Sequence, residues 1–576
     1  MNKVAGIGIS IILVVGVVIG VVAGVSHAGF FDGGSEDSAF PATAVVSTKV
    51  KSAQAICEPM DYKGACEETL KKSNGEVDLK ELVKLFFNET MLHVQRALQK
   101  SEQISLKATD PMNKAAMSDC KDLLEYAKAE LQLALTDVGD REVQTMPERV
   151  HELRNWLSAV ISYQETCKDG ITDPELKSAM SDGMVNATQV TSNALAIVTE
   201  ISSLLEKFHV PFNLSSLTPR NLLEQDENSG EVHDLDLSGT PHWLSGSDRK
   251  LLAFKDTDRP KPNVVVAKDG SGNFNSIGAA LKAMPKSYSG RYIIYVKAGL
   301  YSESVIVDKD QTNVFMYGDG PRRTIVTGSK NYVDGTPTFQ TATFAAVGNN
   351  FLCKSMGFRN TAGPEKHQAV ALRTQSDMSA FVNCRMDGYQ DTLLVQAKRQ
   401  FYRNCVISGT VDFIFGDAAA VLQNCLLVVR KPMDNQQCLV TAQGRTDKRE
   451  NTGIVIHNCR IAPEAKLFPQ RLTIRSYLGR PWKEYSRTVI MESTIGDLIQ
   501  PDGWMPWDGD FALNTLYYAE YANRGPGSGT AKRIKWKGYK VITDRKEALP
   551  FTAGNFIQGG QWLKSINAPY MLGFRR

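Results

Sequence analysis

The chain has 576 residues, of which 42% are hydrophobic and 22% charged, so it is an ordinary globular sequence that is too long for one typical domain. The net charge of +3 hides an uneven distribution: from Asn263 onward there are 40 Lys and Arg against 25 Asp and Glu, and before that point 26 against 38. Only His367 and His457 lie beyond residue 262, and no Gly-x-Ser-x-Gly, His-Glu-x-x-His or P-loop motif occurs. These features argue against a Ser-His-Asp hydrolase or a His-rich metal site in the basic half. The basic half suits a polyanion (nucleic acid, an anionic membrane or an acidic polysaccharide) or the acidic half itself, although ordinary solubility also explains such charges.

The N-terminal segment, residues 1–30, predicts entry into the secretory route. Val4 to Val25 is an uncharged apolar run preceded by Lys3, and it is long enough to cross about 30 Å of hydrocarbon. We therefore expect a membrane-spanning signal-anchor. A signal peptide cleaved after Ser26-His27-Ala28 is the alternative, and the position at the N-terminus disfavours a buried core helix.

Residues 51–210 read as several amphipathic helices. Apolar residues recur at intervals of three and four in a region poor in Gly and Pro, as in Leu79, Leu82 and Phe86, which predicts an up-down helical bundle. Sequons for N-glycosylation occur at Asn88, Asn186 and Asn213, all in the acidic half.

Residues 211–262 are rich in Ser, Asp and Gly and predict a linker. Within the linker, Arg249-Lys250 forms a dibasic pair suited to proteolytic processing, and Arg220 begins a weaker version of the same pattern. A pair of solvated charges is the alternative reading.

From Asn263 the pattern changes to short β-branched runs separated by Gly and Asn, which predicts strands. The dipeptide Asn-Cys recurs at Asn383, Asn404, Asn424 and Asn458, and the first three are 20 or 21 residues apart. A period of this length in a strand-rich chain indicates a solenoid of the parallel β-helix type rather than a β-sandwich. Equivalent residues would then stack one strand spacing apart, about 4.8 Å, so we expect a disulfide between Cys405 and Cys425.

Two aspartates follow the same period. Asp391 and Asp412 are 21 residues apart, so on adjacent turns their carboxyls would stack on one face. Two carboxyls that close cannot both hold a full charge, and one should stay protonated while the other is ionised. Such a pair supplies a nucleophile and a general acid. A ladder of Asn and Asp turn residues without catalytic function is the alternative.

Five segments of the basic half, taken in order, resemble the signature motifs of pectin methylesterases. They are Gly299–Glu303, Gln368–Leu372, Gln390–Leu393, Asp412–Gly416 and Leu478–Trp482, and the resemblance covers about residues 263 to 560. It implies a right-handed parallel β-helix over 263–576 and an enzyme that hydrolyses the methyl esters of homogalacturonan to demethylated pectin and methanol.

The same resemblance implies the roles of the site residues. Asp412 matches the nucleophile, Asp391 the proton donor that later acts as base, and Gln390 the residue that stabilises the oxyanion. Substrate-binding residues match at Thr338, Gln368, Arg480 and Trp482. An ionised carboxylate attacks the ester carbonyl, and methoxide, a poor leaving group, needs the proton. This chemistry requires no cofactor and no metal.

The helical region 51–210 resembles the plant invertase and pectin methylesterase inhibitor domain. The resemblance implies a four-helix bundle with disulfides Cys57–Cys66 and Cys120–Cys167. We expect this pro-region to restrain its own catalytic domain until a subtilisin-like protease cuts near Arg249-Lys250. The other expected partners are pectin and external inhibitor proteins, with no nucleic acid, and the expected location is the cell wall.

Two other functions fit parts of the pattern. A β-helix lyase or glycosidase would act on the same polymer, but neither explains Gln390 beside Asp391; a lyase would want carboxylates for Ca²⁺, and an inverting glycosidase carboxyls about 6.5–9.5 Å apart. A non-enzymatic protein would use the bundle to inhibit other esterases and the basic half to hold wall polysaccharide.

Overall fold

The computed structural model describes residues 56–73, 78–140, 142–207, 260–566 and 568–575. The predicted N-terminal signal segment 1–30, most of the linker 211–262 and the dibasic pair Arg249-Lys250 lie outside these residues. The described residues belong to one compact unit that spans Thr48–Arg576. Within them, no helix has the length and apolar character needed to cross a membrane.

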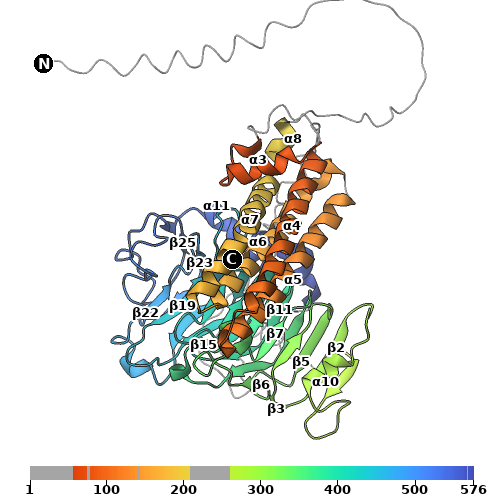
Figure 1. Ribbon diagram of the computed structural model, residues 1–576. Coiled ribbons are helices and arrows are strands. Elements are labelled where there is room, and N and C mark those ends of the chain that lie inside the picture. Colours follow the sequence, from red (N-terminus) through yellow and green to blue (C-terminus); the bar gives the residue numbers. More distant parts are fainter. Residues whose placement is uncertain (1–55, 74–77, 141, 208–259, 567, 576) are drawn as a thin grey trace, which may run out of the picture. The chain divides into compact units, whose positions relative to one another are not determined.

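The N-terminal part is a bundle of four long helices (Figure 1). They are α4 (Leu79–Ser105), α5 (Pro111–Gly139), α6 (Val150–Gly170) and α7 (Pro174–Thr199), accompanied by α3 (Lys63–Lys71), η1 (Val143–Arg149) and α8 (Ile201–Lys207). Three of the long helices begin at an aspartate whose carboxylate accepts a backbone N–H three residues on: Asp78, Asp110 and Asp173. This cap satisfies an N–H that has no partner inside the helix and stabilises each helix by about 1 kcal/mol. Leucines, valines and alanines at helical spacing pack in the centre, as the sequence pattern predicts.

The C-terminal part is a right-handed parallel β-helix built from three sheets. The first sheet has eleven strands: β1 (Val264–Val266), β2 (Tyr292–Val296), β5 (Val314–Gly318), β8 (Leu352–Lys354), β11 (Ser379–Val382), β14 (Arg399–Arg403), β17 (Ala419–Gln423), β20 (Gly453–His457), β23 (Arg487–Met491), β25 (Tyr517–Tyr521) and β26 (Tyr539–Ile542). The eight-stranded sheet contains β3 (Gly299–Ser302), β6 (Thr324–Gly328), β9 (Gly357–Asn360), β12 (Arg385–Asp387), β15 (Val406–Gly409), β18 (Leu426–Val429), β21 (Arg460–Pro463) and β24 (Thr494–Ile495). The seven-stranded sheet contains β4 (Val305–Val307), β7 (Phe344–Ala346), β10 (Leu372–Thr374), β13 (Leu393–Val395), β16 (Ile414–Gly416), β19 (Cys438–Gln443) and β22 (Ser476–Gly479).

Short helices complete this part. They are α10 (Ile277–Lys282) near the first strands, the single turns η4 (Thr338–Thr341), η5 (Pro364–Lys366) and η6 (Phe468–Gln470), and a C-terminal group of α11 (Arg545–Ala548), η7 (Leu549–Phe551), α12 (Ala553–Phe556), α13 (Gly559–Trp562) and η8 (Leu563–Ile566). The C-terminal group packs its apolar residues on the outer face of the eleven-stranded sheet.

The Asn-Cys repeat marks one corner of each coil. Asn383, Asn404, Asn424 and Asn458 each follow a strand of the eleven-stranded sheet and have φ between 50° and 55°. This left-handed conformation is costly for most residues, and asparagine tolerates it better than other side chains with a Cβ. The asparagines therefore recur because the chain must turn there, which confirms the solenoid reading of the period.

The cysteines that follow these asparagines point into the coil interior and remain free thiols. The expected Cys405–Cys425 disulfide is therefore wrong. The backbone N–H of Cys405 instead donates to the Cys425 sulfur at 3.4 Å, and that of Cys425 to the Cys459 sulfur at 3.2 Å. In the bundle, the disulfides Cys57–Cys66 and Cys120–Cys167 are present.

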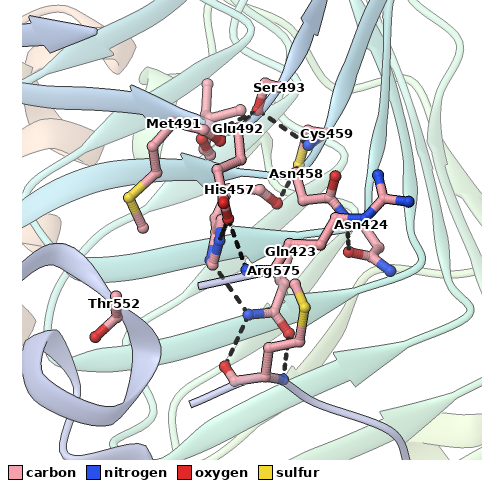
Figure 2. A network of polar contacts seen from close by, with 12 residues as sticks. Gln423, Asn424, His457, Asn458, Cys459, Met491, Glu492, Ser493, Thr552 and Arg575 are labelled. Carbon is pink, nitrogen blue, oxygen red and sulfur yellow. Dashed lines mark hydrogen bonds and ion pairs between the residues drawn. The ribbon is translucent and has the colours of Figure 1, made fainter. Parts of the chain in front are cut away.

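A polar network fixes the C-terminal tail to the eleven-stranded sheet (Figure 2). The side chain of Gln423 donates to the Met571 carbonyl at 2.9 Å and accepts the Met571 N–H at 2.8 Å. Nε2 of the buried His457 lies 2.8 Å from Oε2 of Glu492, which also accepts the Arg575 N–H at 2.9 Å. The tail is thus held by Gln423 of β17 and by Glu492, the residue after β23, and His457 of β20 lies between these two side chains.

Candidate active site

Asp391 and Asp412 occupy equivalent positions on successive coils. Each comes two residues before a strand of the seven-stranded sheet, and these strands pair with Leu393 opposite Ile414. Both residues have positive φ, 62° and 50°, a conformation that aspartate adopts more readily than most side chains. The N–H of Asp391 donates to the Val411 carbonyl at 3.0 Å, so the two residues lie on hydrogen-bonded neighbouring turns.

The two carboxyls have different environments. Burial raises the pKa of Asp391 well above its usual range, and the charge of Asp412 raises it further against the opposing charge of Arg480. Burial also raises the pKa of Asp412, but less, because the charge and the hydrogen bonds of the Arg480 guanidinium offset part of the effect. The difference favours a proton on Asp391, because only Asp412 receives hydrogen bonds from the guanidinium.

Arg480 follows β22 and grips the carboxylate of Asp412. Its Nε lies 3.0 Å from Oδ1 and its Nη2 lies 2.6 Å from Oδ2, a two-pronged geometry that suits the planar guanidinium. The ring of Trp507 covers the other side of Arg480, with its centroid 4.2 Å from Cζ. The sequence interpretation missed Trp507; the tryptophans of Gly503-Trp504-Met505-Pro506-Trp507 were the available signal.

The other residues proposed from the sequence lie on neighbouring coils. Gln390 precedes Asp391 and is partly buried, and its carbonyl accepts the Ala369 N–H at 3.3 Å, which brings the Gln368 segment beside it. Among the described residues, Oε1 of Gln368 is buried without a hydrogen-bond partner. Thr338 begins η4, where the next side chain, Phe339, stacks on the Arg373 guanidinium at 3.5 Å. Gln368 thus lies one coil before Asp391 and Thr338 two coils before it, and the roles of these residues stay predictions.

Trp482 lies over the seven-stranded sheet. Its ring centroid is 5.9 Å from that of Phe415, which is three residues after Asp412. Gly444 makes this position possible, because a Cβ there would come within 2.8 Å of the indole. Phe415 and Trp482 thus form an aromatic floor, and the role of Trp482 in binding substrate stays a prediction.

The bundle covers the apolar outer face of this same sheet. Phe339, Leu394, Phe415 and Ala442 belong to one continuous buried cluster with the core of the bundle, and Trp482 packs against that cluster. The apolar floor beside the carboxyl pair is therefore buried by helices of the same chain.

Polar contacts accompany this apolar packing. Ser162 of α6 donates to the Gln396 carbonyl at 2.8 Å, and the Gln396 side chain donates to Ser162 and Thr166 at 2.9 and 2.7 Å. Gln340 of η4 donates to Asp119 of α5 at 2.8 Å.

Ion pairs join the two parts at four sites. Lys398 pairs with Glu130 of α5, Arg399 lies 3.5 Å from Glu152 of α6, and Lys483 lies 2.8 Å from Asp169 of α6. At the fourth site, Lys448 and Arg449 lie 2.8 and 2.6 Å from Asp61, just before α3. In each pair the acid belongs to the bundle and the base to the β-helix, which agrees in sign with the charge difference between the two halves.

The remaining sequence predictions concern sites away from the candidate active site. Asn88 and Asn186 are exposed on helices α4 and α7, and glycosylation at either stays a prediction. Asn213, Arg249 and Lys250 lie outside the described residues. Across the part of the chain that the structure describes, no group of three or more His, Cys, Asp or Glu side chains is arranged to hold a metal ion.

Comparisons with known proteins agree with this architecture. The model of the pectinesterase family matches residues 263–560, and that of the plant invertase/pectin methylesterase inhibitor family matches residues 51–197. Putative pectinesterase/pectinesterase inhibitor 45 of Arabidopsis thaliana is 46% identical over 545 residues, covering 92% of this chain and 86% of the relative. Pectinesterase 1 of Citrus sinensis is 44% identical over 562 residues, covering 96% and 92%. The solved structure of pectin methylesterase from carrot is 54% identical, with a TM-score of 0.54, and covers 55% of this chain and 99% of that one.

Fold and family match together define a β-helix carboxylic ester hydrolase that follows an inhibitor-like helical domain. The chain belongs to the pectinesterase family.

Proposed function

We propose that this chain removes methyl esters from the galacturonan of pectin, releasing methanol and leaving free carboxylates. The observation that carries the proposal is the pair of buried carboxyls on adjacent coils, of which only Asp412 is held by a guanidinium. One ionised and one protonated carboxyl in contact with a common ligand is the combination that ester hydrolysis by covalent catalysis requires.

In this mechanism, the Asp412 carboxylate attacks the ester carbonyl and forms a tetrahedral intermediate. The amide of Gln390, one residue before Asp391, donates to the oxyanion, a contribution of about 3 kcal/mol for one well-placed donor. Asp391 then gives its proton to the departing methoxide, which leaves as methanol. The resulting carboxylate of Asp391 takes a proton from water, which attacks the acyl-Asp412 anhydride and restores both groups.

Asp412→Asn tests this assignment in the fragment 251–576, the product of cleavage after Lys250. Independent folding of this part is supported by the carrot enzyme, 99% of whose chain aligns with it. We expect methanol release from highly methylated pectin to fall by about four orders of magnitude or more, as for loss of a catalytic nucleophile, with little change in the circular dichroism spectrum. Polymer length should stay constant in the wild-type reaction. Chain shortening, or an active Asn variant, would contradict the proposed chemistry.

We further propose that the bundle inhibits the enzyme in cis. It buries the apolar floor that includes Phe415, and helices α5 and α6 supply the acids that pair with Lys398 and Lys483. A polymer cannot occupy that floor while the helices do. Cleavage at Arg249-Lys250 by a subtilisin-like protease would allow the bundle to leave, and a separate inhibitor protein of the same helical family would fit the vacated surface.

The comparison of full-length chain with fragment 251–576 tests the restraint. The fragment should have the higher specific activity, and addition of excess bundle should reduce it. Equal activity of the two forms would exclude restraint in cis while leaving the esterase assignment intact. The family also favours secretion to the cell wall, with glycans on the bundle, which glycosidase treatment of the secreted chain would reveal.

A further inference from the structure

Lys483 lies on the same short segment as two residues of the candidate active site. Arg480, three residues earlier, binds Asp412, and Trp482 packs on Phe415. The ammonium of Lys483 lies 5.5 Å from the centroid of the Trp482 ring. A cation at this point is therefore beside the aromatic floor on which a sugar ring would lie.

The carboxylates that Lys483 contacts come from the bundle. Its Nζ donates to Oδ1 of Asp169 at 2.8 Å and to Oε2 of Glu165 at 3.3 Å, both on α6. Burial lowers the pKa of Lys483, but the charges and hydrogen bonds of these two acids outweigh that effect and raise it. Among the described residues, no carboxylate of the β-helix pairs with Lys483. Departure of the bundle would thus leave the Lys483 ammonium beside Trp482 without its two carboxylate partners.

We propose that Lys483 is a binding subsite for a free carboxylate of galacturonate near the ester under attack, and that Glu165 and Asp169 occupy this subsite in the uncleaved chain. The inference rests on the proposed function, because it names a feature of the substrate that the same site recognises. The chemical fit is direct. A demethylated galacturonate unit presents one carboxylate, and an ammonium beside an aromatic ring binds that group and its sugar together.

Lys398 shows why this role is assigned to Lys483. Lys398 also pairs with a bundle acid, Glu130, but its ammonium has a second partner within the β-helix, Oδ1 of Asn349 at 3.2 Å. Lys398 follows the C-terminal end of β13, whereas Asp391 precedes the N-terminal end of the same strand. We therefore assign Lys398 to holding the bundle. Lys483, by contrast, follows the arginine that binds the nucleophile.

The test measures kcat and KM of fragment 251–576 on two pectins of equal length, one fully methylated and one about half demethylated. Lys483→Gln should raise KM on the half-demethylated pectin about tenfold, the effect of losing one charge-assisted hydrogen bond, and change KM on the fully methylated pectin less than about twofold. The kcat of the variant should stay within about twofold on both. Lys483→Arg should retain the wild-type preference, and Lys282→Gln, on the exposed α10 lysine, serves as the control for charge alone.

Binding of fully demethylated polygalacturonate, measured by calorimetry, provides a readout that needs no turnover. Its affinity should fall about tenfold in Lys483→Gln, and the wild-type affinity should weaken with added salt. An equal change of KM on both pectins, or unchanged polygalacturonate binding by a folded variant, would overturn the subsite. If Lys483→Gln does not fold, Lys483→Met takes its place under the same criteria. A wild-type fragment that releases no methanol would instead refute the proposed function, and the binding experiment would still decide the subsite.

Discussion

Replacing Arg480 by glutamine tests the central electrostatic idea, that the guanidinium keeps Asp412 ionised. Breaking a buried ion pair by removing one partner typically costs about 3–5 kcal/mol. The Arg480 side chain is 21% exposed, so we take the lower end. About 3 kcal/mol in the transition state corresponds to a fall of about 150-fold in kcat at neutral pH.

The pH profile gives the sign of the effect. The guanidinium lowers the pKa of both Asp412 and Asp391, so its removal raises both. The acidic limb of the rate profile reports ionisation of the nucleophile and should move to higher pH, so activity loss should be largest on the acidic side. Arg480→Lys should keep most of the pH profile, because it keeps the charge, but it should recover only part of the rate, because an ammonium cannot make the two-pronged contact.

The assay follows methanol release by fragment 251–576 from highly methylated pectin between about pH 4 and 9, a range wide enough to contain both limbs of a bell-shaped rate profile. Arg471→Gln is the matched control, because it removes an arginine that also binds an aspartate with two prongs, at the exposed Asp497. That change should leave kcat and profile intact. If Arg480→Gln lowered kcat without moving the acidic limb, the guanidinium would not be controlling the charge of Asp412, and the reasoning would fail.

Three further predictions concern stability and docking. Lys398→Gln in the uncleaved chain leaves Glu130 buried without its cation, so the bundle should dock about 3–5 kcal/mol less tightly and the esterase activity of the uncleaved chain should rise. The double variant Lys398→Gln, Glu130→Gln should restore part of the docking. Equal activity of the wild type and both variants would refute a role for the pair. Loss of the Cys120–Cys167 disulfide opens a 47-residue loop and should lower the free energy of unfolding by about 4 kcal/mol, against about 2.6 kcal/mol for Cys57–Cys66, whose cysteines are 9 residues apart. Denaturant unfolding of the full chain without reductant measures both values. The reverse order would contradict the loop-entropy argument. Burial would raise the pKa of Glu492, but hydrogen bonds from His457 and the Arg575 N–H outweigh this and lower it. Glu492 therefore stabilises the fold above its unfolded pKa of about 4.3, and this stabilisation is lost as the pH falls through the folded pKa. Glu492→Gln should make Tm depend less on pH in this acidic range, and an unchanged slope would exclude the network of Figure 2 as the source of the dependence.

Sequence periodicity predicted the solenoid because its cause is local. Each Asn-Cys step marks a left-handed turn that asparagine tolerates, so the 20- or 21-residue period of the first three steps reports the coil length directly. The same period placed Asp391 and Asp412 on adjacent turns. The helices were equally accessible, because aspartate caps and apolar spacing are local signals.

Features that depend on more than spacing, or on distant segments, were not accessible. The spacing of Cys405 and Cys425 is compatible with a disulfide, but both are free thiols in the structure, and spacing alone does not report whether the bond forms. Trp507 contacts Arg480 from a separate loop, and Lys483 meets α6 residues more than 300 positions earlier in the chain. The first contact depends on how a loop of the β-helix folds back on β22, and the second on how the bundle packs on the seven-stranded sheet.

The stacking of Asp391 above Asp412 has a consequence for how such a site tolerates change over evolutionary time. The spacing of the two backbones is set by the hydrogen-bond ladder between β13 and β16, not by the side chains around them. Connections such as the one between β18 and β19, which is longer than its counterparts before β13 and β16, can grow or shrink without moving the reacting groups. A single residue gained or lost between either aspartate and the strand that begins two residues later would move one carboxyl out of line with the other, so heritable length variation should be confined to connections away from these two turns.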